Sequence, residues 1–370
     1  MSSSFESGTD RRSFLARVAA ATAVPAAAAL VAGGAATPAS AATAGASSSG
    51  SSGSSAGDGL PDYAPVPAGS LGPAVNSQGY YVGRVKHNLY WVTDGDYQAA
   101  FLTTREGVVL FDAPPTIGHN LQRAVDEIAA ANGTSNKVTH IVHSHHHSDH
   151  VGASGLFGRD VVRIGHEENR RLLLRDNNPN KPAPDVTFAD RYTLHVGGER
   201  VELSHHGSNH SPDNIFIQFP HHDTLMLVDI TIPGWAPFGA LNYSEDIQGY
   251  LAAPAKALSY PWKHHIAGHM GRLGRRADVT VHQQYIDDLT ASIKQALGTV
   301  DYGVYAAKYG NNIWAVVKTW LDEVCRQAAA PVAAKYTGTL AAADVFTESS
   351  AFSLVESLRL DLGLGSAIHD

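Results

Sequence analysis

Short runs of apolar and β-branched residues, separated by turn residues, follow one another from residue 79 onward. Runs of about four to eight such residues are typical of strands. The expected strands cover residues 80–85, 89–93, 99–104, 108–111, 138–142, 161–164, 191–196, 201–204, 214–219 and 224–228. Asp94-Gly95 and Glu106-Gly107 are turn dipeptides between neighbouring runs.

Two segments among these strands have helical character instead. In residues 121–131 the apolar positions recur every three or four residues, and Asn132-Gly133 then favours a helix end. A second helix is expected over residues 167–175. Pairs of strands alternating with helices predict an α/β protein in which two sheets pack together with helices outside, rather than a single doubly wound sheet.

After Gly274 the strand pattern fades and apolar residues follow the helical period. One stripe consists of Tyr285, Leu289, Ile293 and Leu297, and a second consists of Ile313, Val317, Trp320, Leu321 and Val324. We expect a main domain over residues 63–275 and a helical C-terminal extension over residues 276–370. The stripes favour docking of this extension on the main core, with a lid or a dimer surface as the alternative.

The N-terminal residues read as an export signal followed by a linker. Arg11-Arg12 precede Ser13-Phe14-Leu15 and an alanine-rich apolar stretch, a pattern that resembles a twin-arginine signal. Small residues around Ala41 predict cleavage there, so residues 1–41 would be removed and the protein would be periplasmic or extracellular. The alternative is an uncleaved membrane anchor. Serine and glycine dominate residues 42–62, which predicts a flexible linker.

Composition and charge narrow the classes of partner. The 370 residues are 44% hydrophobic and 17% charged, typical of a globular protein rather than a disordered one. The net charge of −8 provides no cationic field for nucleic acid or anionic lipid. We therefore expect a small-molecule substrate, no nucleic-acid partner and no stable membrane span after cleavage, and the oligomeric state stays open. The single cysteine, Cys325, cannot form an intramolecular disulfide.

Histidines are the compositional anomaly, with 20 in the chain and eleven between His140 and His210. His145 and His147 alternate in an extended segment directly after the expected strand 138–142, so both side chains can reach one metal ion. Asp149 and His150 follow, and a turn there would direct them to a second ion. This mixture of imidazole and carboxylate suits Zn²⁺, with iron or manganese as alternatives.

The spacing His-x-His-x-Asp-His at residues 145–150 resembles the signature of the metallo-β-lactamase superfamily. The resemblance implies a four-layer αββα sandwich of the metallo-β-lactamase type, carrying here a helical C-terminal extension. It also implies two metal sites, formed by His145, His147 and His210 and by Asp149, His150 and His269, with Asp229 bridging them. Val228 is a departure, because many members have glycine before the bridging residue.

Two divalent ions a few ångströms apart can hold a bridging water and lower its pKa from about 15.7 toward neutrality, which produces a hydroxide nucleophile. Asp149 would orient this nucleophile and handle its proton. Aspartate at residue 229, where the resemblance implies cysteine or serine in true β-lactamases, favours esters and lactones. We therefore expect an exported hydrolase with two Zn²⁺ per chain that cleaves an ester, lactone or amide.

Trp235 and Phe238 follow Asp229 closely enough to line such a site and contact an apolar substrate. The alternative is that both side chains pack in the core. Two other functions stay open at this point. One is a mononuclear iron enzyme that oxidises persulfides, and the other is a secreted metal-binding protein without catalysis.

Overall fold

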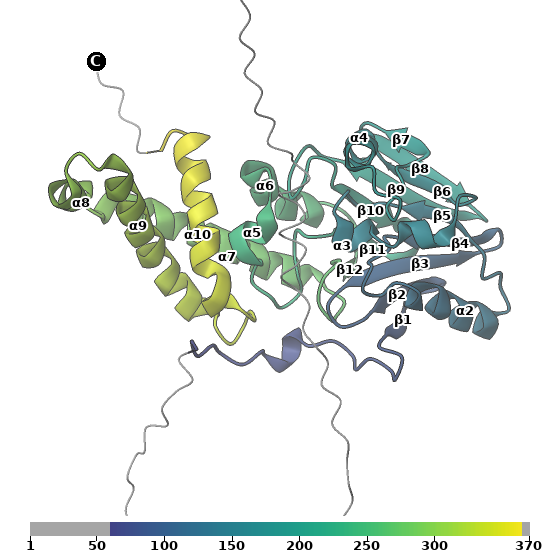
Figure 1. The fold of residues 1–370 in the computed structure, drawn as a ribbon. Helices are drawn as coiled ribbons and strands as arrows, with labels where there is room; N and C mark the ends of the chain where they lie inside the picture. The colour runs from purple at the N-terminus through teal and green to yellow at the C-terminus, as the bar shows by residue number, and fades with distance from the viewer. Residues whose placement is uncertain (1–59, 365–370) are drawn as a thin grey trace, which may run out of the picture. The chain divides into compact units, whose positions relative to one another are not determined.

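Two mixed β-sheets pack against each other in the computed structural model, which describes residues 60–364 (Figure 1). The expected signal, residues 1–41, and residues 42–59 of the expected linker lie outside the described residues. The seven-stranded sheet has the order β1 (Tyr81–Lys86), β2 (Leu89–Thr93), β3 (Gln98–Thr104), β4 (Gly107–Phe111), β5 (Val138–Val142), β6 (Val162–His166) and β7 (Val186–Phe188). The five-stranded sheet has the order β12 (His264–Ile266), β11 (Thr224–Met226), β10 (Ile215–Phe219), β9 (Glu199–His205) and β8 (Arg191–Val196).

Strand directions change within each sheet. β1 to β4 are antiparallel, whereas β5, β6 and β7 continue from β4 in parallel. In the smaller sheet β12 is parallel to β11 and the other pairs are antiparallel. Parallel neighbours bring their carboxyl ends to one edge, so the loops after β5 and β6 leave the sheet on the same side.

Three hydrophobic clusters separate four layers, because strand side chains alternate between the two faces of a sheet. Ala100 and Leu102 of β3 lie in the cluster between the sheets together with Ile217 of β10. Phe101 points the other way, into a cluster with Leu121 of helix α2 (Asn120–Asn132). The predicted αββα sandwich is therefore confirmed.

The fourth layer covers the outer face of the smaller sheet. Phe216 of β10 packs there against Tyr250 of α6 (Ile247–Leu258) and Tyr285 of α7 (Arg276–Thr299). The same cluster continues into α9 (Ile313–Tyr336) and α10 (Ala343–Leu360), which lie beside α7 in Figure 1. The helical C-terminal extension is confirmed, and its two apolar stripes contribute Tyr285, Leu289, Ile293, Leu321 and Val324 to this core.

The remaining helices are short or capped by side chains. They are α3 (Ser148–Val151), α4 (Glu167–Asp176), α5 (Gly239–Tyr243) and α8 (Tyr302–Tyr309), with 3₁₀ turns η1 (Ala68–Ser70), η2 (Ser154–Phe157) and η3 (Pro220–His222). No helix within residues 60–364 is long and apolar enough to cross a bilayer.

Most expected strands and helices are present with ends shifted by one or two residues, while β7, β12, α6 and the short helices α3 and α5 have no counterpart in the sequence prediction. The strands β7 and β12 have three residues each, too few for an alternating pattern. The helix α6 contains Gly249 and Pro254, both poor helix residues, and its burial against α7 compensates. The strand expected at 224–228 ends at Met226.

Candidate metal centre

The loop after β5 begins the candidate site. The buried carboxylate of Asp112 accepts a hydrogen bond from the Ser144 amide at 2.7 Å, and burial raises the pKa of Asp112 to about 7. Ser144 Oγ lies 2.9 Å from His145 Nδ1, which leaves Nε2 of that ring for another partner. The short helix α3 then starts after His147 and carries Asp149 and His150.

The first group of side chains comprises His145, His147, His210 and Asp229, whose ligand atoms all lie within 4.8 Å of one another. His147 Nδ1 and His210 Nε2 are 3.0 Å apart. Asp229 Oδ2 lies 3.1 Å from His210 Nε2 and 3.4 Å from His145 Nε2. Segments more than sixty residues apart in the chain thus converge on one point.

The second group comprises Asp149, His150 and His269. His150 Nε2 and His269 Nε2 are 3.1 Å apart, and Asp149 Oδ2 lies 3.4 Å from the former and 3.6 Å from the latter. Asp229 contacts this group too, through Oδ2 to His150 at 3.0 Å and Oδ1 to His269 at 3.1 Å. Its carboxylate therefore lies between the two groups.

These spacings fit metal ions. Tetrahedral nitrogen ligands at about 2.0–2.1 Å from Zn²⁺ are about 3.3 Å from one another. Nε2 of His145 and Oδ1 of Asp229 are buried and make no hydrogen bond, although a buried polar atom is normally paired. Pairs of imidazole nitrogens about 3 Å apart also need a proton or a cation between them.

The electrostatics of the first group favour neutral imidazoles. Burial lowers the pKa of His145 to about 4 and that of His147 to about 2, with neighbouring histidines adding to the effect. A neutral ring keeps a lone pair for a cation. Burial alone would raise the pKa of Asp229, but His150, His269 and His210 hold it well below the usual value, so this carboxylate is ionised.

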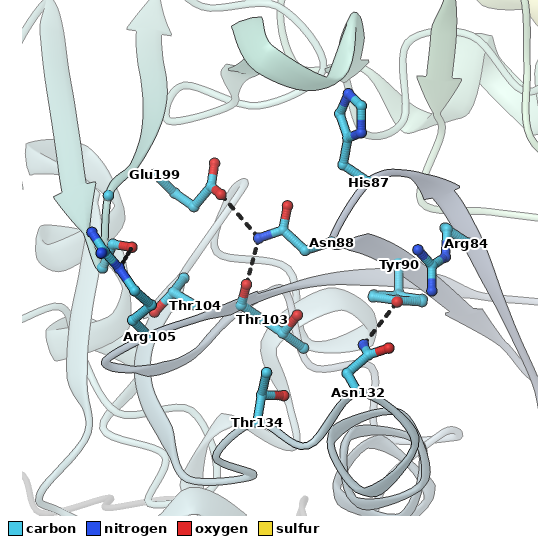
Figure 2. Close-up of a pocket in the computed structure, with 12 residues that line it drawn as sticks. Arg84, His87, Asn88, Tyr90, Thr103, Thr104, Arg105, Asn132, Thr134 and Glu199 are labelled. Atoms are coloured by element: carbon cyan, nitrogen blue, oxygen red, sulfur yellow. Dashed lines mark hydrogen bonds between the residues drawn. The ribbon is translucent and has the colours of Figure 1, made fainter.

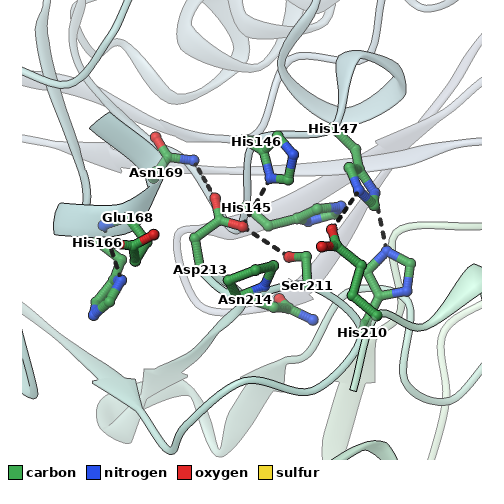
Figure 3. A network of polar contacts seen from close by, with 12 residues as sticks. His145, His146, His147, His166, Glu168, Asn169, His210, Ser211, Asp213 and Asn214 are labelled. Atoms are coloured by element: carbon green, nitrogen blue, oxygen red, sulfur yellow. Dashed lines mark hydrogen bonds and ion pairs between the residues drawn. The ribbon is translucent and has the colours of Figure 1, made fainter. Parts of the chain in front are cut away.

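The buried carboxylate of Asp213 contacts the loop that carries the candidate histidine ligands (Figure 3). Asp213 lies 2.9 Å from His146 Nδ1 and accepts hydrogen bonds from Asn169 Nδ2 at 2.9 Å and Ser211 Oγ at 2.8 Å. His146 is thus engaged with Asp213 through Nδ1, and it also forms a third group with His147 and Glu245, whose ligand atoms lie within 4.8 Å of one another. Asp213 also ties the loop after β5 to the loop that carries His210.

Other nearby histidines are engaged elsewhere. His143, the alternative start of the motif, is buried and lies 3.2 Å from Asn169 Oδ1 and 3.1 Å from Ser154 Oγ. His206 lies 2.6 Å from the Tyr260 hydroxyl. His265 lies 3.0 Å from the Thr231 carbonyl. The spacing that selects His145 over His143 agrees with this geometry.

The loop that carries His269 is held by β3. The Gln98 side-chain amide donates to the His269 carbonyl at 3.1 Å and to the Arg272 carbonyl at 3.0 Å. Gly268 has φ of +87°, a region that favours glycine. The ring of Tyr97, beside Gln98, lies 4.7 Å from the His269 ring.

Both groups open into a cavity of about 660 Å³. Its polar end is lined by His147, Asp149, His210, Asp229 and His269, and its apolar wall includes Ile232, Trp235, Phe238, Tyr243 and Phe346. The structure thus places Trp235 and Phe238 in the same cavity as the ligand groups. A second cavity, of about 570 Å³, lies near Arg84, Arg105 and Glu199 and contains none of the seven candidate ligands (Figure 2).

Residues 92–241 match the family described as the Metallo-beta-lactamase superfamily. Over this segment the chain is similar to the metallo-β-lactamase superfamily. The match begins in β2 and ends just after Phe238, so it includes six of the seven candidate ligands, all except His269.

Two curated relatives resemble part of the chain. Metallo-beta-lactamase type 2 of Elizabethkingia meningoseptica is 27% identical over 154 residues, which are 39% of this chain and 59% of that protein. The 2,4-dinitroanisole O-demethylase subunit alpha of Nocardioides sp. (strain JS1661) is 23% identical over 218 residues, which are 57% of this chain and 62% of that protein. The chain thus spans about three fifths of the length of these relatives. A solved metallo-beta-lactamase from Pontibacter korlensis aligns at 21% identity and a TM-score of 0.48, over 55% of this chain and 97% of that one.

Several residues around the candidate metal centre had no signal in the sequence prediction. They are Tyr97, Gln98, Asp213, Asn242 and Phe346. Asp213 follows His210 closely and is a residue type that pairs with histidine, so proximity was a usable clue. Phe346 lies more than a hundred residues from every other candidate except His269, and only the packing of α10 brings it to the cavity.

Proposed function

We propose that the chain is an exported metal-dependent hydrolase with two divalent ions, most suitably Zn²⁺, that cleaves an ester, lactone or amide. The observation that carries this proposal is the position of Asp229, whose carboxylate contacts histidines of both ligand groups. One carboxylate shared by two groups is the arrangement that a pair of ions requires. His145, His147 and His210 would hold the first ion, and Asp149, His150 and His269 the second.

Two ions held there would polarise a substrate carbonyl and make water more acidic. The protein's own contribution is positioning. Ser144 and Asp213 orient the histidine loop, and Gln98 orients the loop of His269. The Asp149 side chain is 40% exposed and lines the cavity, so its carboxylate can accept a proton from the attacking water.

The substrate class rests on the residues of the site. Asp229 provides a second carboxylate beside Asp149, rather than a thiol or hydroxyl, which supports ester or lactone cleavage over β-lactam cleavage. The names of the two relatives describe different activities, a β-lactamase and an O-demethylase of 2,4-dinitroanisole, so neither activity is transferred as such. Export rests on Arg11-Arg12 and the alanine-rich stretch that follows.

Metal counting and turnover of the full chain test this proposal. We expect two metals per chain by elemental analysis and hydrolysis of at least one member of a panel of esters, lactones, amides and β-lactams without oxygen consumption. Asp149→Asn should lower kcat/KM by about 100-fold or more, because general acid–base groups contribute about that much. The control Asp190→Asn changes an exposed carboxylate outside both groups and should leave turnover unchanged.

Two results would overturn the proposal. One iron per chain with oxygen-dependent oxidation of persulfides would indicate the mononuclear iron persulfide dioxygenase instead. Two bound metals with no turnover on any member of the panel would indicate a metal-binding protein. Replacing His210 by alanine should reduce the metal content, whereas His206→Ala should not, because His206 is paired with Tyr260 outside the ligand groups.

A further inference from the structure

The C-terminal extension forms part of the cavity wall. Ala342 and Phe346, at the start of α10, line the same cavity as the ligand groups. The Phe346 ring lies 4.7 Å from the Phe238 ring at an interplanar angle of 62°, and the Tyr243 ring lies 5.4 Å from the Phe238 ring. Phe238 is 48% exposed and Tyr243 66% exposed, so these rings present open faces rather than a closed core.

This wall is attached to α10 through the backbone. The Ala236 amide donates to the Ala341 carbonyl at 3.0 Å, and the Ala341 amide donates to the Gly234 carbonyl at 2.9 Å. Trp235 lies between these two bonds and is itself a cavity residue. The position of the indole is therefore coupled to the residue that precedes α10.

A left-handed turn completes the wall. Ala240, Leu241, Asn242 and Tyr243 have φ of 55°, 56°, 59° and 54°, a conformation that is unfavourable for residues with a Cβ. Hydroxyls on α10 accept hydrogen bonds from this turn, Ser349 from the Ala240 amide at 3.3 Å and Ser350 from the Leu241 amide at 3.4 Å. Such strain persists only where surrounding contacts over-determine it, and α10 provides these contacts.

The wall has a distinct chemistry. Its surface is aromatic and apolar, formed by Trp235, Phe238, Tyr243 and Phe346. Apart from histidines, the charged residues that line the cavity within residues 60–364 are all carboxylates, namely Asp96, Asp149 and Asp229. An anionic group held against this wall would lose its hydration without a lysine or arginine to pair with it. A neutral planar ring would lose only apolar surface from water and gain ring contacts.

We propose that α10 and the left-handed turn form a subsite for a neutral aromatic group beside the metal centre, and that Phe346 determines this specificity. This inference rests on the proposed hydrolase function, because that function supplies the reaction. The subsite itself can be tested by binding alone. The substrates are then neutral esters or lactones that carry an aromatic ring near the scissile bond. The ring stacks on the wall while the carbonyl faces the ligand groups.

Binding of alcohols that cannot be hydrolysed tests the subsite without any turnover. We compare benzyl alcohol and cyclohexylmethanol on the metal-loaded full chain by saturation-transfer NMR titration. We expect benzyl alcohol to bind about 5-fold more tightly than cyclohexylmethanol. Phe346→Ala should weaken benzyl alcohol binding about 5-fold and largely remove its advantage over cyclohexylmethanol.

Two further variants keep this test independent of folding. Phe346→Leu retains apolar volume but removes the ring, and should also lose the preference. Phe352→Ala removes an exposed phenylalanine of the same helix that does not line the cavity, and should leave both affinities unchanged. Equal binding of the two alcohols by the unmodified chain, or an unchanged preference in Phe346→Leu, would overturn the inference.

Turnover of the matching acetate esters separates this inference from the proposed function. Each kcat/KM is divided by the alkaline hydrolysis rate of the same ester, which removes intrinsic reactivity. A benzyl preference that disappears in Phe346→Ala supports both proposals. Metal-dependent turnover without that preference overturns the subsite alone, and the binding preference without turnover of any ester overturns the hydrolase alone.

Discussion

Val228 occupies the space that a side chain at residue 268 would need. A Cβ built on Gly268 would lie 2.5 Å from Val228 Cγ1 and 3.2 Å from His150 Cε1. Val228 is the residue at which the sequence departs from the metallo-β-lactamase pattern, and its side chain is fully buried between the sheets. The glycine before His269 thus accommodates the valine before Asp229.

This relationship predicts a coupled pair of substitutions. Gly268→Ala should lower the free energy of unfolding by about 2–4 kcal/mol, because it combines overpacking with an unfavourable φ. In the Val228→Ala background the same change should cost at least about 1 kcal/mol less, because the clash with Val228 Cγ1 is removed while the backbone strain and the close contact with His150 stay. Urea unfolding of the four proteins measures this coupling. Strictly additive effects would contradict the shared space.

Asn242 links the left-handed turn to the centre. Its side-chain amide donates to the Asp229 carbonyl at 2.9 Å and to the Tyr250 hydroxyl at 3.1 Å, while its oxygen accepts from the Phe238 amide at 2.6 Å. Both Asn242→Ala and Asn242→Gly should lose about 1–3 kcal/mol of stability through these bonds.

The two variants at residue 242 should also differ from each other. Alanine should be about 1 kcal/mol less stable than glycine there, because φ is +59°. At ordinary backbone angles alanine is the more stable of the two, so the sign of the difference reports the conformation. Thermal unfolding of both variants gives that sign, and alanine proving the more stable would argue against the turn.

Asp213 is predicted to be essential for the arrangement of the histidine loops. The Asp213 carboxylate is the hydrogen-bond partner of His146, Asn169 and Ser211. Asp213→Asn puts an amide in its place and should lower the free energy of unfolding by about 2–4 kcal/mol. Metal content should fall as well, because His146 and Ser211 are each adjacent in sequence to candidate ligands. The control Asp160→Asn alters an exposed carboxylate and should change neither quantity. Unfolding in urea and elemental analysis provide the two readouts.

His282 should make stability depend on pH. It is buried on α7, with Nε2 3.3 Å from the Tyr250 hydroxyl, and burial lowers the pKa of His282 to about 3, with His265 adding to the shift. The unfolded chain, with a histidine pKa of about 6.5, binds a proton that the folded chain does not. The free energy of unfolding should therefore fall by about 1.4 kcal/mol per pH unit between about pH 6 and pH 4 from this group alone.

A neutral replacement isolates that contribution. In His282→Gln the titrating group is absent while all others stay, so the difference in stability between variant and unmodified chain should shift in favour of the variant as pH falls. Above about pH 7 the difference should be constant. Parallel stability curves down to pH 4 would show that His282 titrates normally in the folded protein.

Local patterns in the sequence were enough for much of the sandwich. Alternation in β3 and β10 and the helical period of α2 are properties of neighbouring residues, and these elements formed as predicted. The strand β12 was not predictable in this way, because its three residues include two histidines and it is held by pairing with β11. Elements whose stability comes from a partner leave little trace in their own residues.

The sequence by itself determined the α/β class, the order of most strands and helices, and the spacing of residues 145–150 that places four candidate ligands together. Tertiary structure alone decided that Asp229 contacts both histidine groups, that Gly268 must lack a side chain beside Val228, and that Phe346 reaches the cavity. The reason is the distance along the sequence over which each kind of information acts. Periodicity is a property of neighbouring residues, whereas contacts between residues far apart in the chain depend on how sheets and helices pack.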